Sequence, residues 1–270
     1  MSGPGAGDLF DGPALSAVPR SGLVLAAGLG RRMRPFTETR PKPLIVVGGQ
    51  SLLDHALDRL AAAGIGQVVV NAHWHAEQIE QRLAARAAQR GDGATAVVRR
   101  EPVLLDTGGA VRAALAEGLL DADAPFFVIN GDSLWLDGPR PALLRLAERL
   151  DPAHTDVVLL VSRVAWAVGD IGRADFSGDF ALDPDGRVRR RREHEIVPYI
   201  YAGVQIVSPR LFDDAPIGSF SMNQLWDRAM ARGRLRALVH ESLWFHFSRP
   251  ADIASAEVAL RDPMAGPPNT

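Results

Sequence analysis

Short apolar runs alternate along the chain with segments in which apolar residues recur every three or four positions. A short continuous run is typical of a strand that is buried on both faces, and the recurring pattern is typical of a helix with one buried face. Expected strands cover residues 22–26, 67–71, 94–99, 125–130 and 156–161. Expected helices cover residues 51–63, 75–88, 109–119 and 141–150.

This alternation predicts an α/β fold that is Rossmann-like, with a mostly parallel central sheet and helices on both faces. Between residues 171 and 207 the pattern changes to short pieces around the sequence DPDG at 183–186, which predicts a small inserted β-hairpin region. We expect a single domain over residues 21–261. The Gly- and Pro-rich ends, 1–20 and 262–270, are expected to be a flexible extension and a flexible tail.

The composition narrows the class of protein. The 270 residues are 47% apolar and 23% charged with a net charge of −2, so nothing in the charge indicates nucleic acid or an anionic membrane as a partner. The absence of cysteine excludes disulfides and thiolate metal ligands. No apolar run is long enough to span a membrane, and residues 1–20 do not resemble a signal peptide. We therefore expect a cytoplasmic protein, with its oligomeric state left open.

The first expected strand leads into a glycine-rich, basic segment, LAAGLGRRMRP, over residues 25–35. Gly28 and Gly30 carry no side chain, so their backbone N–H groups can approach an anionic ligand closely. Arg32 adds positive charge, and Lys42 follows between two prolines that favour extended backbone. A triphosphate needs such donors and cations. The alternatives are a tight turn and a solvated lysine, since neither G-x-G-x-x-G nor the P-loop pattern is complete.

Two further polar motifs follow expected strands, where ligands of open α/β sheets bind. Thr107, Gly108 and Gly109 open a helix, and their backbone N–H groups are expected to face a base or a phosphate; a helix cap by Thr107 is the alternative. Asn130, Gly131 and Asp132 stand at the end of a strongly apolar strand. A carboxylate there is a natural ligand for Mg²⁺ beside bound phosphates, and a capping role is again the alternative.

The run L-A-A-G-x-G-x-R-M-x-P-x-T, followed by P-K-P-L, resembles the sugar-nucleotide pyrophosphorylases, which are nucleotidyltransferases with a Rossmann-like sheet. The resemblance implies a nucleoside triphosphate and a sugar 1-phosphate as substrates, and Mg²⁺, with Mn²⁺ as a possible substitute, as cofactor. It implies that Arg32, Lys42 and Asp132 are catalytic. It assigns nucleotide binding to Leu25, Ala26, Ala27, Gly28, Gly30, Arg32, Thr107, Gly108 and Gly109.

The resemblance covers roughly residues 22–260 and is greatest to the short bacterial N-acetylmuramate 1-phosphate uridylyltransferases of cell-wall recycling. The shared features are APFFVINGD at 124–132, GRADF at 172–176 and YAGVQ at 201–205. UTP is therefore the favoured triphosphate. The resemblance implies that Asn130, Asp175 and Gly203 lie on the sugar side of the site.

The chain departs from the family pattern near its end. Family members carry W-x-D-x-G-T, whose Asp is a second metal ligand, and here the aligned residues are Trp244 to Arg249 with His246 at the position of the Asp. Because histidine is a poor Mg²⁺ ligand and prefers softer ions, three outcomes are open. His246 binds Mn²⁺, donates to a phosphate, or marks the loss of this half of the metal site. We expect Asp252 to lie on the following helix rather than in the site.

Three functions remain in competition. The first is the uridylyltransferase, and the second is the same reaction with glucose or mannose 1-phosphate and dTTP, UTP or GTP. The third is a catalytically weak sugar-nucleotide-binding regulatory protein. Two other features are expected to have structural roles only: the arginine run at 187–192 as a solvated hairpin edge, and the His-Trp-His sequence at 73–75, which has no third metal ligand nearby in the sequence.

Overall fold

A central sheet organises the computed structural model, which describes residues 19–90, 95–169 and 177–261. Within these ranges nine strands form the sheet, in the order β11-β10-β12-β6-β1-β4-β5, with β8 paired to β12 and β13 paired to β8. The core strands are β1 Ser21–Leu25, β4 Gln67–Ala72, β5 Thr95–Arg100, β6 Phe126–Asn130, β8 Val157–Arg163, β12 Tyr199–Val207 and β13 Leu235–Val239. The five predicted strands are all present, shifted by one or two residues at most of their ends.

The register of the parallel strands brings polar side chains together at one edge. β1 pairs in parallel with both β4 and β6, so that Leu25 lies opposite Asn71 on one side and Asn130 on the other. β12 is antiparallel to β6 and to β8, and β13 is parallel to β8. The predicted mostly parallel sheet is therefore confirmed, with β12 as an antiparallel strand inside it.

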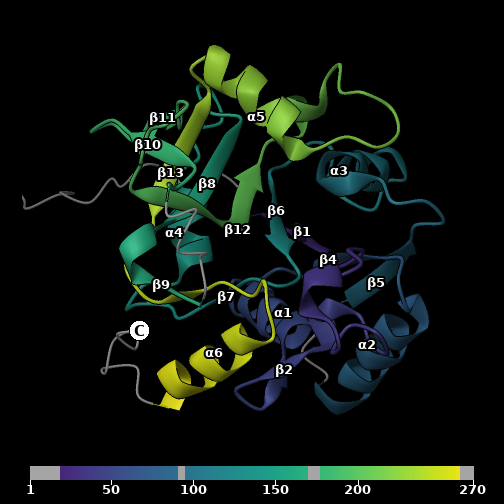
Figure 1. Ribbon diagram of the computed structural model, residues 1–270. Helices are drawn as coiled ribbons and strands as arrows, with labels where there is room; N and C mark the ends of the chain where they lie inside the picture. The colour runs from purple at the N-terminus through teal and green to yellow at the C-terminus, as the bar shows by residue number, and fades with distance from the viewer. Residues whose placement is uncertain (1–18, 91–94, 170–176, 262–270) are drawn as a thin grey trace, which may run out of the picture.

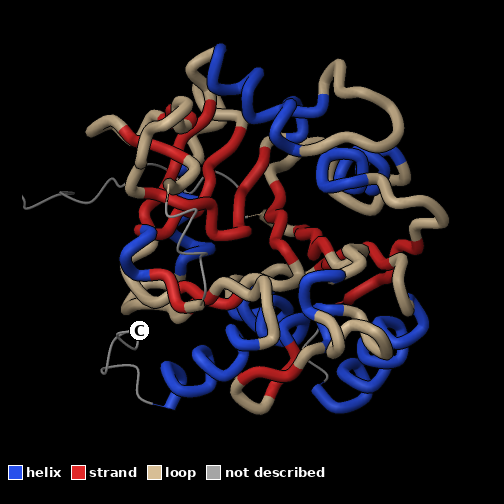
Figure 2. The backbone as a smooth tube through the Cα atoms, viewed as in Figure 1, coloured by secondary structure: helices blue, strands red, loops and turns tan. Residues whose placement is uncertain are grey.

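Helices cover both faces of this sheet, as predicted (Figures 1 and 2). One face is covered by α1 Leu52–Ala62, α2 Ala76–Arg90 and α4 Ala142–Arg149, and the other by α3 Asp106–Ala116 and α5 Met222–Ala231. Leu53 of α1 and Ile79 of α2 are completely buried in the first layer, and Val111 of α3 and Leu225 of α5 in the second. Each helix thus buries one apolar face, as the recurrence of apolar residues every three or four positions indicates.

The helix α1 begins and ends where its sequence indicates. Ser51 precedes it and its hydroxyl accepts a hydrogen bond from the Asp54 N–H at 3.1 Å, as an N-cap residue does. Gly64 follows the helix with φ of +79°, a conformation that terminates helices and favours glycine. These local signals explain why its predicted bounds agree with the structure within a residue.

The helix α3 begins three residues earlier than expected. The N–H groups of Gly108 and Gly109 both donate to the Phe220 carbonyl, at 2.9 and 3.1 Å, and the Thr107 hydroxyl accepts from the Met222 N–H at 2.9 Å. Thr107 lies inside the first turn and its helix-capping alternative is wrong. The partners are more than 100 residues away in sequence, so no local pattern indicates them.

The inserted hairpin was predicted, whereas a smaller sheet was not. The hairpin consists of β10 Phe180–Leu182 and β11 Val188–Arg190, joined by the DPDG turn. A three-stranded sheet of two-residue strands, β7 Leu134–Trp135, β14 Trp244–Phe245 and β9 Ala167–Val168, packs with α6 Ala251–Arg261. The remaining elements are β2 Val46–Val47, β3 Gln50–Ser51 and the 3₁₀ turns η1 Arg31–Met33, η2 Lys42–Leu44, η3 Val164–Trp166 and η4 Pro209–Phe212.

None of the helices in the described part of the chain combines the length and the apolar character that a bilayer span requires. The three-part division into residues 1–20, 21–261 and 262–270 stays a prediction, since residues 1–18 and 262–270 lie outside the described ranges.

A buried carboxylate joins the two helices α1 and α2. Asp54 is 1% exposed and accepts from Arg82 Nε at 2.7 Å, and its other oxygen lies 3.5 Å from Arg86. Removing one partner of a buried ion pair leaves the other charge poorly compensated. We expect Asp54→Ala to lower the free energy of unfolding by about 2–4 kcal/mol, measured by urea denaturation.

The control for this variant is Glu80→Ala, which removes an exposed pair with Arg100. Exposed pairs contribute little to stability, so we expect no resolvable change in its unfolding midpoint. Equal unfolding midpoints for Asp54→Ala and the wild-type protein would contradict a stabilising role for Asp54 between α1 and α2.

Candidate active site

A cavity of about 510 Å³ opens at the carboxyl ends of β1, β4, β5 and β6. This edge is where ligands of open α/β sheets bind. Its wall consists of Leu25, Ala26, Ala27, Gly28, Gly30, Arg31, Arg32, Met33, Lys42, Pro43, Asn71, Glu101, Leu104, Asp106, Thr107, Asn130, Asp132, Ser219 and Ser248. Most of the residues predicted from the sequence are therefore brought together around one space.

Neighbouring strands hold the loop after β1 in place. The Ala26 N–H donates to Asn71 Oδ1 at 2.7 Å, and the Gly131 N–H donates to the Leu25 carbonyl at 2.8 Å. Further along, the Thr37 hydroxyl donates to the Gly30 carbonyl at 2.8 Å. These bonds fix the entry and the turn of the loop, while Gly28 stays exposed at the cavity wall.

Asn71 and Glu101 are cavity residues that the sequence interpretation missed. Asn71 Nδ2 donates to Glu101 Oε1 at 2.8 Å, and the other Glu101 oxygen accepts from the Leu105 N–H at 3.1 Å. Glu101 is 3% exposed. Asn71 thus connects the loop after β1 with the loop after β5. A polar residue at the end of an apolar strand was the one available signal for it.

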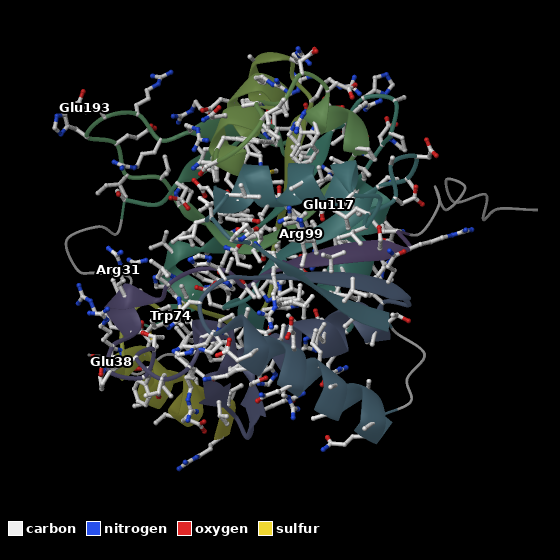
Figure 3. All side chains as sticks on the ribbon, turned by 90° about the vertical axis from the view of Figure 1, so that its right-hand side faces the viewer. Arg31, Glu38, Trp74, Arg99, Glu117 and Glu193 are labelled. Carbon is white, nitrogen blue, oxygen red and sulfur yellow. The ribbon has the colours of Figure 1, made fainter. Side chains whose placement is uncertain are left out.

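Two arginines carry exposed positive charge at the cavity. Arg31 and Arg32 lie on η1, directly after the glycine loop. Both side chains line the cavity, and neither has a hydrogen-bond or ion-pair partner among the described residues. Figure 3 shows Arg31 at the edge of the molecule. Unpaired guanidinium groups on a cavity wall favour an anionic ligand such as a phosphate chain.

Lys42 is the only lysine in the sequence, and it lies at the centre of the site. Its ammonium donates to the Asp132 carboxylate and to the Phe247 carbonyl. The Lys42 side chain is 13% exposed and that of Asp132 is 36% exposed. The pair joins η2 to the loop after β6, so two of the three residues predicted to be catalytic are in direct contact.

His246 lies beside this pair but not on the cavity wall. His246 directly follows β14, and its backbone N–H donates to the Val168 carbonyl at 2.8 Å. Burial lowers the pKa of His246. The charges of Lys42 and Arg32 lower its pKa further, whereas Asp252 and Asp132 oppose the shift. The imidazole is therefore neutral at pH 7 and lies within electrostatic range of the candidate catalytic residues.

Asp132 is the predicted metal ligand that lies on the cavity wall. In the described part of the chain no group of three or more His, Asp or Glu side chains could hold a metal ion. Asp132 supplies one carboxylate to the cavity, and Mg²⁺ is commonly bound by one or two carboxylates together with substrate phosphates and water. The residues therefore fit a Mg²⁺ that arrives with a triphosphate. Asp252 is on α6, where it accepts from the Ser248 and Arg249 N–H groups, as expected.

The paired glycines of α3 are placed behind the cavity wall. A Cβ at Gly108 would lie 2.3 Å from the Phe220 ring, and one at Gly109 would lie 2.2 Å from the Gly218 carbonyl oxygen. Their N–H groups already bond to Phe220. Both glycines thus let the segment 218–220 lie directly against α3, and their assignment to the nucleotide stays a prediction.

The predicted sugar-side residues have different positions. Asn130 lines the cavity, whereas Gly203 lies behind it in a bulge of β12. Gly203 has φ of +75°, and a Cβ there would lie 1.9 Å from the Ser133 hydroxyl, so its absence of a side chain is a packing requirement. Asp175, with the GRADF sequence at 172–176, lies outside the described residues.

A second cavity of about 330 Å³ adjoins the first, sharing Leu25, Asp106, Thr107 and Asn130 with it. Its other walls come from the hairpin, β12 and α5. They consist of Asp179, Phe180, Arg190, Tyr201, Gln205, Ser221, Met222, Asn223 and Trp226. The expectation that the whole arginine run is a solvated edge is therefore wrong for Arg190, which reaches this cavity.

The His-Trp-His sequence has the structural role that was expected. Trp74 Nε1 donates to the Thr37 carbonyl at 3.1 Å, and His73 Nδ1 lies 2.7 Å from the Glu101 carbonyl. His75 Nε2 lies 3.3 Å from the Glu38 carbonyl. Trp74 and Glu38 lie on the same side of the molecule in Figure 3. Trp74 and His75 thus hold the loop that precedes Lys42, and His73 contacts the segment after β5.

Comparison with known proteins identifies the family. Residues 22–242 match the MobA-like NTP transferase domain. The chain belongs to this family of nucleotidyltransferases. An N-acetylmuramate alpha-1-phosphate uridylyltransferase of Caulobacter vibrioides is 40% identical over 92% of the chain and 100% of the relative. A protein of the same name from Neisseria meningitidis is 34% identical over 82% of the chain and 90% of the relative.

More distant nucleotidyltransferases share the fold. A mannose-1-phosphate guanyltransferase of Neurospora crassa is 31% identical, over 85% of the chain and 61% of the relative. The structure of an inositol-1-phosphate CTP transferase from T. maritima superposes with a TM-score of 0.70 at 18% identity, covering 92% of this chain and 98% of that one. The predicted nucleotidyltransferase fold is thereby confirmed.

The two glycines of the loop are expected to respond differently to an added methyl group. Gly30 has φ of +59°, and a Cβ there would lie 2.8 Å from Thr37 Cγ2, whereas a Cβ at Gly28 meets no atom within 4 Å. We expect Gly30→Ala to lower the free energy of unfolding by about 1–3 kcal/mol. Gly28→Ala should keep wild-type stability and weaken nucleoside triphosphate binding, because the methyl occupies the cavity.

Urea denaturation and calorimetric nucleotide titration of both variants separate the two effects. Wild-type nucleotide affinity in Gly28→Ala would contradict the role of this loop in binding.

Proposed function

We propose that the protein transfers a uridylyl group from UTP to N-acetylmuramate 1-phosphate, forming UDP-N-acetylmuramate and pyrophosphate. The observation that carries this proposal is the single cavity in which Arg31, Arg32, Lys42 and Asp132 meet. The identity of 40% to the uridylyltransferase of Caulobacter vibrioides, along its full length, supports the substrates. Because the reaction consumes a nucleoside triphosphate, the cytoplasm is the compartment we propose for it, within cell-wall recycling.

In this proposal the two adjoining cavities take the two substrates. The triphosphate lies against the loop after β1, where Gly28 leaves room and Arg31 and Arg32 offer unpaired charge. The sugar 1-phosphate lies in the second cavity, with its phosphate toward the shared wall at Asn130 and Thr107. This arrangement brings the two phosphates together at the junction, so that binding itself supplies the proximity that the reaction needs.

The chemical step is an in-line displacement at the α-phosphorus of UTP. An oxygen of the sugar phosphate forms the new P–O bond, and the bond to the bridging oxygen of the β-phosphate breaks with pyrophosphate leaving. No general base is needed, because the attacking phosphate is already ionised at neutral pH. Lys42, Arg31 and Arg32 provide positive charge where negative charge develops. Mg²⁺, bound through Asp132, would supply further charge neutralisation.

Two other functions differ from this one in specific ways. Another sugar 1-phosphate or base would use the same first cavity, and the mannose-1-phosphate guanyltransferase relatives favour that possibility. A catalytically weak binding protein is favoured by His246, which stands where the family pattern has an Asp. These functions differ in which sugar 1-phosphate and nucleoside triphosphate, if any, react with release of pyrophosphate.

The test is pyrophosphate release from each of UTP, dTTP and GTP with N-acetylmuramate, glucose and mannose 1-phosphates, under Mg²⁺ and under Mn²⁺. We expect the highest kcat/KM for UTP with N-acetylmuramate 1-phosphate. We further expect Lys42→Ala and Asp132→Asn each to lower kcat/KM at least about 100-fold, as loss of a charge partner of the transition state does. Lys42→Arg should also lose activity, because a guanidinium is broader than an ammonium.

Arg140→Ala serves as the control, since Arg140 pairs with Glu148 at the exposed surface and should keep wild-type kinetics. Preference for another sugar phosphate would overturn the substrate assignment alone. Nucleotide-dependent thermal stabilisation without pyrophosphate release under either metal would instead support the binding protein. Near-normal activity of Lys42→Ala would overturn the site.

His246 provides a separate test of the metal site. If His246 stands at the position of a lost carboxylate ligand, His246→Asp restores an oxygen ligand suited to Mg²⁺. We expect the Mg²⁺-dependent rate to rise in this variant and the ratio of the Mn²⁺ to the Mg²⁺ rate to fall. His246→Asn, which is similar in size to Asp and uncharged, is the matched control. An unchanged metal preference in His246→Asp, with folding intact by thermal denaturation, would exclude a metal-site position for this residue.

A further inference from the structure

The second cavity has one cationic side chain on its described wall, that of Arg190. Arg190 ends β11 of the hairpin and faces the N-terminal end of α5. The other charged residues of the wall are Asp106 and Asp179. A cavity of about 330 Å³ falls within the size range of small-molecule sites. Its ligand therefore meets a single positive charge at a defined place.

The guanidinium of Arg190 is held in position by its neighbours. Its Nε donates to Asp227, and its Nη2 donates to Asn223 Oδ1 at 2.9 Å. It lies over the Phe180 ring at 5.5 Å from the ring centre. Its Nη1 has no partner among the described residues. Arg190 is thus fixed on one side by α5 and keeps donors for a ligand, an arrangement that reduces the entropy lost on binding.

The nearby carboxylates define what kind of ligand fits. Asp227 is 56% exposed and is not part of the cavity wall, so water screens its charge. Asp179 is on the wall, and one of its oxygens accepts from the Tyr201 N–H at 2.9 Å. Carboxylates at Asp106 and Asp179 accept hydrogen bonds from hydroxyl groups and repel anions. A ligand that fits this cavity therefore carries hydroxyl groups, which donate to the two carboxylates, and one anionic substituent, which pairs with Arg190.

Tyr201 lines the same cavity, and its hydroxyl is buried beneath the wall. The Tyr201 hydroxyl is buried and has no hydrogen-bond partner within 3.5 Å in the described part of the chain. Burial raises the pKa of Tyr201, so the hydroxyl keeps its proton and can donate. Buried polar atoms are costly when unpaired.

We infer that Arg190 binds an anionic substituent on the sugar ring of the acceptor, a carboxylate distinct from the 1-phosphate, and so determines specificity for acidic sugar 1-phosphates. This inference rests on the proposed function and extends it. N-acetylmuramate differs from N-acetylglucosamine by a lactyl ether that carries such a carboxylate. The two 1-phosphates therefore form a matched pair of probes.

The experiment measures kcat/KM for both sugar 1-phosphates with UTP, in the wild-type protein and in Arg190→Ala. We expect Arg190→Ala to lower kcat/KM for the muramate 1-phosphate about 10- to 100-fold, since a hydrogen bond to a charged group contributes on this order. The kcat/KM for N-acetylglucosamine 1-phosphate and the KM for UTP should each change by less than about threefold. Arg190→Lys should restore part of the discrimination.

Arg189→Ala is the matched control, because Arg189 is the preceding residue of the same strand, pairs with exposed Glu195 and lies outside the cavity wall. We expect it to leave both substrates unaffected. Equal losses for both sugars in Arg190→Ala would indicate a structural role and overturn the inference, while the proposed function would stand. No loss for either would overturn it as well.

Failure of the proposed function gives a different result. If the wild-type protein prefers sugar 1-phosphates without a carboxylate, the assignment of the substrate and the inference about Arg190 are both wrong. The proposed nucleotidyl transfer reaction would still stand. If no sugar phosphate is turned over, calorimetric titration with the same two sugar phosphates still tests Arg190. Tighter binding of the muramate 1-phosphate that disappears in Arg190→Ala supports the inference, and equal binding of the two sugars overturns it.

Discussion

The ion pair between Lys42 and Asp132 is the contact on which the candidate site depends. It joins the segment after the glycine loop to the end of β6, and the Phe247 carbonyl adds a third part of the chain. An ammonium has three N–H donors, and two are used here, so one remains for a ligand. The other 29 of the 30 basic residues are arginine. A compact cation at this one position suits a narrow place between a carboxylate and a carbonyl.

The parallel strands supply the surroundings that this pair needs. Because Leu25 lies between Asn71 and Asn130 in register, the loops after three adjacent strands begin at the same edge. Asn71 then bonds to both the first loop and Glu101. The candidate site thus uses the carboxyl ends of parallel strands, where ligands of open α/β sheets bind. The second cavity shares four wall residues with the first, and the rest of its wall comes from the hairpin, β12 and α5.

Local patterns were sufficient to predict the main strands, the helix α1, the hairpin and the residues Lys42 and Asp132. Long-range contacts were not predictable in this way. The start of α3 depends on Phe220, and Asn71 acquires its role only beside Glu101. Strands of two residues have no detectable period, which explains why the sheet of β7, β9 and β14 was missed. Arg190 resembles its exposed neighbours in sequence, and only its position against α5 distinguishes it.

His246 changes the charge balance around the ion pair. The sequence resemblance implies that His246 replaces a carboxylate, which would remove one negative charge from the neighbourhood of Lys42; burial lowers the pKa of the ring and so favours its neutral form. Asp132 then provides the one carboxylate on the cavity wall that contacts Lys42, against the positive charges of Lys42, Arg31 and Arg32. With fewer fixed anions, the site attracts phosphate groups more strongly and holds a divalent cation less tightly by itself. A Mg²⁺ that acts here would then take most of its ligands from substrate phosphates and water.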